Sequence, residues 1–126
     1  MAELTDNELL LLSQLGYSLF KEGQYQKAIN IFEGLSELRP RNSEMHAVLA
    51  VLYHLTDNPQ NALREAVEAL KGKQNDVALL MTLGEVYLTL KQKDNARDIL
   101  TRAYEQARRL NHPAQNRIYF LLQSNP

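Results

Sequence analysis

The sequence contains no cysteine and no tryptophan, and only 5 glycines and 4 prolines occur among its 126 residues. Without cysteine the chain can form neither a disulfide nor a thiolate metal site. The charge is nearly balanced, with 14 Lys and Arg against 15 Asp and Glu, so no bulk electrostatic attraction to nucleic acid or anionic membrane is expected. No apolar run could cross a bilayer, and the acidic Glu3, Asp6 and Glu8 are opposite in charge to a signal peptide. These absences predict a cytoplasmic protein without membrane insertion.

The residue patterns that catalysis or metal binding would need are also missing. His46 and His54 are eight positions apart on one predicted helix, too far for two imidazoles to bind one metal ion, and His112 lies in a predicted loop. No glycine-rich phosphate loop and no nucleophile motif occurs. Asp94 and Asp98, one helical turn apart, fit a surface ion-pair pattern better than acid–base work. We therefore expect no enzyme activity, no catalytic residue, no cofactor and no metal site.

Basic residues gather toward the C-terminus, between Lys91 and Arg117. No aromatic residues interleave with them as a stacking platform for nucleic acid would need. We interpret this region as the solvated face of the last helices and expect no nucleic-acid partner.

A period of 34 residues runs through the chain. Residues of the same kind recur at this spacing: Ala28, Ala62 and Ala96; Leu15, Leu49 and Leu83; Gly16 and Gly84 with Ala50 between them; Tyr53 and Tyr87 with Leu19 before them. A period of this length is typical of stacked helix–turn–helix units.

The residues at these positions resemble the tetratricopeptide repeat. The three copies read Leu12, Leu15-Gly16, Leu19, Ala28, Phe32 and Pro40; His46, Leu49-Ala50, Tyr53, Ala62 and Ala66; and Leu80, Leu83-Gly84, Tyr87, Ala96 and Leu100. The resemblance implies an all-α fold, an α-solenoid of three tetratricopeptide helix–turn–helix repeats with a C-terminal capping helix. It implies one domain, residues 1–126, with repeats at about 9–42, 43–76 and 77–110 and the cap at about 113–123.

Local signals predict where the helices begin and end. Thr5 and Glu8 have the spacing of a capping box, and Gly23 supplies a left-handed residue that ends the first helix. Asn42 or Ser43, Asn58 before Pro59, Asn75 or Asp76, and Asp94 are the predicted caps of the third to sixth helices. The predicted helices are about 6–21, 24–38, 43–55, 59–72, 77–90, 94–110 and 113–123.

Small residues are predicted where the two helices of each unit cross, because short side chains let the helix axes approach closely. A larger residue there would overpack the joint. We assign structural roles to these positions and to the proline that ends the second helix: Gly16, Ala28, Pro40, Ala50, Ala62, Gly84 and Ala96.

In the tetratricopeptide family, ligands bind the concave face formed by the first helix of each unit. Carried over to this sequence, the resemblance implies a protein-binding groove of Leu10, Gln14, Tyr17, Phe20, Lys21, Ala47, Val48, Val51, His54, Leu55, Met81, Glu85 and Leu88. Ser13, Glu44, Ala78, Thr82 and Thr89 lie at further positions of the same face.

The first helices are apolar nearly all round, as the runs 9–12 and 47–53 show. A helix that is apolar on every side must be buried on every side, and a repeat stack buries only one. We expect a bound protein segment on the other side, with dimerisation through this face as the alternative. Lys21 is the one cation at the carried-over positions, so the family's clamp for carboxylate tails is missing, and the ligand should be apolar or amphipathic.

The short chain, its apolar groove and its added C-terminal helix resemble the small bacterial type III secretion chaperones. These keep an export-apparatus subunit or translocator in solution in the cytoplasm until it is secreted. No long helix precedes the first repeat, which favours the subunit chaperones that form heterodimers, although a homodimer stays possible. The alternative is a generic scaffold or co-chaperone in pilus or envelope assembly. An enzyme or RNA-binding protein ranks third.

Overall fold

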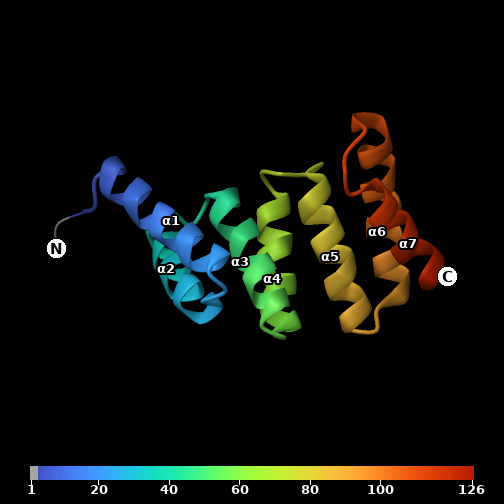
Figure 1. Cartoon of the computed structure of the whole chain (residues 1–126), viewed down its shortest axis with the longest axis horizontal. Helices are drawn as coiled ribbons and strands as arrows, with labels where there is room; N and C mark the ends of the chain where they lie inside the picture. The colour runs from blue at the N-terminus through green and yellow to red at the C-terminus, as the bar shows by residue number, and fades with distance from the viewer. Residues whose placement is uncertain (1–2) are drawn as a thin grey trace.

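The computed structural model describes residues 3–126 and, within them, contains seven α-helices and no strand. Consecutive helices pack against each other and follow one another along the long axis of the molecule, from the N-terminal to the C-terminal end (Figure 1). The prediction of an all-α solenoid is confirmed. The helices are α1 (Asp6–Lys21), α2 (Tyr25–Leu38), α3 (Ser43–Leu55), α4 (Pro59–Leu70), α5 (Val77–Thr89), α6 (Lys93–Leu110) and α7 (Gln115–Ser124).

The predicted ends of the first helices are confirmed. At α1 the Glu8 backbone N–H donates to the Thr5 hydroxyl at 3.1 Å, and the Thr5 N–H donates to the Glu8 carboxylate at 2.9 Å. Gly23 follows this helix with a left-handed φ of 77°. Asn42 caps α3 by accepting from the Met45 N–H at 3.1 Å. Reciprocal bonds of this kind satisfy backbone donors that a helix leaves free at its start.

The turn inside each unit repeats with the same period and corrects the predicted start of α6. A left-handed residue recurs at Gly23, Asp57 and Lys91. The next residue donates its N–H five positions back, at 2.8 to 2.9 Å. This turn places the N-cap of α6 at Gln92.

Asp94 is therefore not the cap of α6, since it lies within the first turn. Asn58 precedes α4 as predicted, but its side chain donates to the Thr56 carbonyl instead of capping the helix. The fourth helix ends at Leu70 and not at Gly72. Side-chain preference placed the cap of α6 too late because the turn at Lys91 sets where that helix begins. At the end of α4, the N–H groups of Lys71 and Gly72 instead donate three residues back, to the carbonyls of Glu68 and Ala69.

Small residues lie where the helices of a unit cross. A Cβ built on Gly16 would lie 2.7 Å from the Phe32 ring, and one built on Gly84 would meet Leu100. The middle unit has Ala50 and Ala66 at the equivalent positions, both fully buried in one cluster. The other predicted alanines, Ala28, Ala62 and Ala96, are at most 1% exposed, and Pro40 follows α2.

The last helix covers the apolar face of α6. Ile118 is fully buried against Leu100, Ala103 and Ala107, and Leu121 and Leu122 pack on the same cluster. The helix begins at Gln115, two residues later than predicted. Across residues 3–126, none of the helices combines the length and the apolar character that crossing a membrane requires.

Candidate functional site

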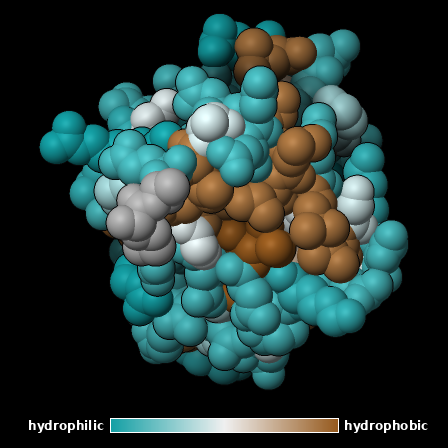
Figure 2. Space-filling view, turned by 90° about the vertical axis from the view of Figure 1, so that its left-hand side faces the viewer, coloured by the Kyte–Doolittle hydropathy of each residue, from teal (hydrophilic) through white to brown (hydrophobic). Residues whose placement is uncertain are grey.

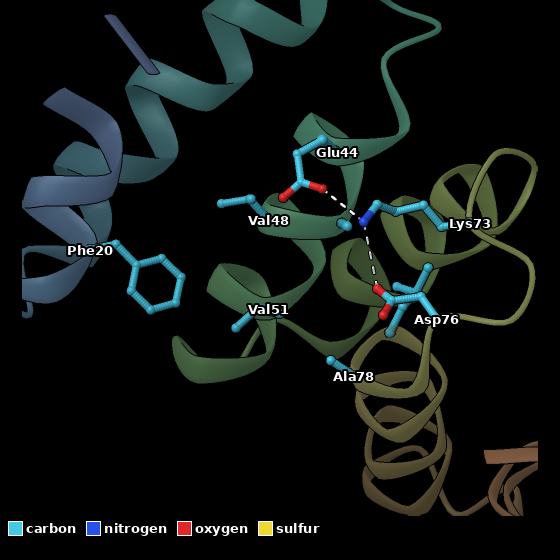
Figure 3. A pocket seen from close by; sticks show the side chains of 9 residues that line it. Phe20, Glu44, Val48, Val51, Lys73, Asp76 and Ala78 are labelled. Carbon is cyan, nitrogen blue, oxygen red and sulfur yellow. Dashed lines mark ion pairs between the residues drawn. The ribbon is translucent and has the colours of Figure 1, made fainter. Parts of the chain in front are cut away.

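A cavity of about 170 Å³ opens between α1, α3 and the start of α5. Its apolar wall consists of Phe20, Ala47, Val48, Val51, Ala78 and Leu79, and Glu44, Lys73 and Asp76 line the rest. Figure 3 shows Phe20 reaching from α1 toward Val48 and Val51 of α3. Residues far apart in the sequence meet here because consecutive units are stacked side by side.

The cavity exists because small side chains stand where three helices approach one another. Ala47 and Val51 are one turn apart on α3, and Ala78 lies at the beginning of α5. The Phe20 ring packs edge-on against Tyr25, with ring centroids 5.8 Å apart. A preformed, largely apolar hollow of this kind can bury an apolar side chain of a bound protein segment.

A chain of hydrogen-bonded and ionic groups borders the cavity. The Tyr17 hydroxyl donates to Glu44 Oε1 at 3.2 Å. Lys73 Nζ lies 2.8 Å from Glu44 Oε2 and 3.7 Å from Asp76 Oδ2, and Figure 3 marks both ion pairs. The chain links α1 and α3 to the loop between α4 and α5.

These contacts shift the ionisation of the three groups. The hydrogen bond from Lys73 holds the pKa of Glu44 below its ordinary value, and the same bond raises the pKa of Lys73. Burial, together with the Glu44 carboxylate, raises the pKa of Tyr17 to about 12. The polar edge of the cavity is therefore charged at neutral pH, with its one cation held between two carboxylates.

A second charged cluster connects α3, α5 and α7. Glu85 Oε2 lies 2.9 Å from Arg117 Nη2 and 3.7 Å from His54 Nε2. Burial alone would raise the pKa of Glu85, but His54 and Arg117 outweigh it and the pKa is lowered. Two predicted groove residues, His54 and Glu85, are thus engaged in contacts within the chain.

The structure brings four of the predicted groove residues together in the cavity: Phe20, Ala47, Val48 and Val51. Of the others, Leu10, Gln14, Lys21 and Leu55 are exposed, and Met81 and Leu88 are half-buried against the cluster of α5, α6 and α7. Tyr17 packs edge-on against Phe32 at 5.1 Å and reaches the site through Glu44.

Three cavity residues were not predicted: Lys73, Asp76 and Leu79. Lys73 and Asp76 precede α5 and so lie outside the first-helix positions from which the groove was inferred. The repeat period holds a signal for one of them, because Asp76 is 34 residues after the N-cap Asn42. Leu79 belongs to α5 and is 3% exposed, so its side chain lines the cavity from within the core and adds little accessible surface.

Residues 3–126 contain no group of three His, Asp or Glu side chains arranged to hold a metal ion. The histidines lie instead in contacts within the chain: His46 with Glu65, His54 with Glu85, and His112 with the backbone N–H of Ala114.

Comparison with known families and structures gives matches along nearly the whole chain. Two models of the tetratricopeptide repeat match residues 13–77 and 77–109. No curated protein sequence matches significantly.

Among solved structures, PcrH from Pseudomonas aeruginosa is 21% identical, with a TM-score of 0.86 over 97% of this chain and 94% of its own. PcrH in complex with the chaperone binding region of PopD is 20% identical, with a TM-score of 0.87 over 98% and 95%. The type III secretion translocator chaperone SycD of Yersinia enterocolitica is 18% identical, with a TM-score of 0.88 over 97% and 86%. At these identities the likeness is one of fold.

Proposed function

Because the chain belongs to the tetratricopeptide repeat family, we propose that it is a protein-binding module acting as a type III secretion chaperone. It holds an apolar or amphipathic segment of an export-apparatus subunit or translocator in its concave groove. The observation that carries this proposal is the apolar cavity between α1, α3 and α5, on a side of the first helices that the stack leaves open. The proposal includes the repeat division 9–42, 43–76 and 77–110 and a cytoplasmic location, where such a client is held before export.

The matched structures support this choice within the family. PcrH has been solved with the chaperone binding region of PopD, and SycD is described as a translocator chaperone. Both align with this chain over almost its full length. The cavity supplies a place for a client side chain.

The chemistry of the cavity selects the kind of client. Burying one branched or aromatic side chain contributes roughly 1.5–3 kcal/mol. We propose as anchoring residues of the groove Tyr17, Phe20, Val51, Leu55 and Met81. Glu44 and Asp76 already hold the cation Lys73 between them, so an acidic client would meet two carboxylates at the cavity edge beside an ammonium that is already paired. An apolar or amphipathic segment fits this environment.

The test is binding of a translocator or export-apparatus subunit encoded beside the gene, measured by calorimetry with wild-type protein and variants. Val51→Asp places a carboxylate in the cavity wall, and Met81→Asp places one farther along the same face. We expect each to weaken binding by about ten-fold or more, since one apolar anchor is lost. The helical spectrum should stay unchanged in Val51→Asp, whereas Met81→Asp also places a carboxylate against the cluster of α5, α6 and α7 and should lower stability as well. Arg97→Ala, on the exposed surface of α6, is the matched control and should bind like wild type.

Salt provides an independent check. Binding through apolar contacts should persist at about 0.5 M salt, because screening weakens exposed charge pairs and not burial. If binding collapsed in salt and Val51→Asp had no effect, the basic surface near the C-terminus would be the site, and the chaperone proposal would be wrong.

A further inference from the structure

The outer side of α1 exposes large apolar residues at the N-terminal end of the stack. Leu11 is 65% exposed and Leu15 is 48% exposed. Viewed from this end, the molecule shows a broad apolar area surrounded by polar residues (Figure 2). Contiguous exposed apolar surface of this kind marks an interaction site more often than scattered single residues do.

The repeat register shows what kind of element covers such a face. Leu49 and Leu83 lie one and two periods after Leu15, and each is 1% exposed. Leu49 shares a buried cluster with Ile29 of α2, and Leu83 shares one with Ala66 of α4. In both cases the second helix of the preceding unit covers the leucine. No helix of the described chain takes that place against α1, so the face is shaped to receive one more helix.

The charges on α1 indicate what that helix carries. Glu8 lies seven residues before Leu15 and Glu22 seven residues after it, so both fall on the same stripe of the helix as the exposed leucines. The hydrogen bonds from Thr5 hold the pKa of Glu8 below its ordinary value, which keeps it anionic. Lys21 points about 120° away from this stripe at 100° per residue. The apolar face is therefore framed by a carboxylate at each end.

A second copy of α1 matches this face poorly. Two parallel copies would bring Glu8 onto Glu8 and Glu22 onto Glu22. Two antiparallel copies centred on Leu15 would bring Glu8 of each onto Glu22 of the other, since both are seven residues from Leu15. Either arrangement gathers four carboxylates along one interface without a cation on the stripe. Like charges placed this way oppose association, whereas cations would favour it.

We infer that the outer face of α1 binds an amphipathic helix of a partner protein, in the position that α2 takes against α3. The partner helix presents an apolar ridge to Leu11 and Leu15 and carries Lys or Arg near both ends, opposite Glu8 and Glu22. This site is separate from the groove, because Tyr17 of the groove lies two residues from Leu15 and so on the far side of α1. A client in the groove and a helix on this face can be bound together.

The experiment uses the full chain and two synthetic helical peptides with the same Leu/Ala ridge, one with Lys and Arg near its ends and the other with Glu. Binding is measured by fluorescence anisotropy at low salt. We expect the basic peptide to bind at least about ten-fold more tightly than the acidic one. Leu15→Glu should weaken its binding by about ten-fold or more, and Glu22→Lys should reduce or reverse the preference between the peptides.

Two control variants separate this site from others. Leu110→Glu changes a leucine of similar exposure, 54%, at the other end of the molecule, and should bind the basic peptide like wild type. Val51→Asp alters the groove and should also leave this binding unchanged, so failure here is distinguishable from failure of the chaperone proposal. Leu11→Gln repeats the test with an uncharged change, and thermal melts of all variants check that the fold is intact.

Three outcomes would overturn the inference. The first is equal or absent binding of the two peptides. The second is binding that Val51→Asp abolishes and Leu15→Glu does not. The third is a wild-type dimer in sedimentation that Leu15→Glu converts to monomer, because a second copy would then cover the face.

Discussion

At the C-terminal end of the stack, α7 covers the last apolar face, and Ile118 is fully buried beneath it. At the N-terminal end nothing comparable lies over α1 in the described chain, and Leu15 is 48% exposed. Leu83, the same residue type at the same position of the repeat, is 1% exposed. The contrast shows that repeat position alone does not determine burial in a solenoid. What determines it is whether a neighbouring unit is present.

The largest expected effect on stability is at Leu83, the leucine that a neighbouring unit covers. Leu83→Ala removes a buried side chain packed between α4 and α5, and we expect it to lower the free energy of unfolding by about 2–5 kcal/mol. Urea unfolding followed by circular dichroism measures it. A loss below about 1 kcal/mol would show that the packing of α4 over Leu83 is looser than the structure indicates.

Overpacking the middle of the stack should have the next largest effect. Ala62 is fully buried in α4, and Ala62→Leu should cost about 1–3 kcal/mol, since no space exists for the larger side chain. The matched control is Ala78→Leu, because Ala78 is exposed and faces the cavity. The control should unfold like wild type while filling the client site. Coinciding urea melts of Ala62→Leu and wild type would mean that Ala62 does not lie at a helix crossing.

The middle unit contains a largely buried ion pair, whose side chains are 11% and 14% exposed. His46 Nδ1 lies 2.7 Å from Glu65 Oε2, and His46 Nε2 lies 2.7 Å from the Pro40 carbonyl. Both ring nitrogens face acceptors, so only the protonated ring can donate to both. Burial alone lowers the pKa of His46, but Pro40, Glu65 and Glu68 outweigh it and the pKa is raised.

This pair predicts a pH dependence of stability. Because the folded pKa of His46 is raised, the protonated ring contributes fully below the ordinary pKa of 6.5, and the contribution is lost as the pH rises through the folded value. Urea midpoints should therefore fall over that range in wild type and stay flatter in His46→Gln. An identical pH profile for the variant would show that the ring does not carry the effect.

The helices could be predicted from the sequence because the features that form them are local. The left-handed residue recurs at Gly23, Asp57 and Lys91, and this turn fixes where each following helix begins. Only the first is a glycine, so residue type would not have revealed the other two, whereas the period does. The cap of α6 was wrongly predicted at Asp94 because aspartate is a favoured capping residue, whereas the 34-residue period of the turn places the cap at Gln92.

The candidate site was predictable only in part. Phe20, Ala47 and Val51 follow from first-helix positions, but Lys73 and Asp76 come from a loop. That loop reaches α3 only because successive units are stacked at a particular angle. Likewise, no local pattern distinguishes Leu15 from Leu83, since the difference is the presence of another helix. The repeat pattern predicts the helices within each unit, but it does not predict the contacts between units.

The smallest effect on stability is expected at Leu15, at the uncovered N-terminal end of the stack. Leu15→Ala should change the free energy of unfolding by only about 0.5 kcal/mol, because the side chain is half exposed and its loss leaves no closed cavity. The measurement is urea unfolding beside Leu83→Ala, at two protein concentrations roughly a hundred-fold apart. An isolated monomer should give the same small difference at both, because unfolding of a monomer does not depend on concentration. Suppose instead that Leu15→Ala were as costly as Leu83→Ala, and only at the higher concentration. The leucine would then be covered by another copy of the chain, and the two ends of the stack would differ only until the protein associates.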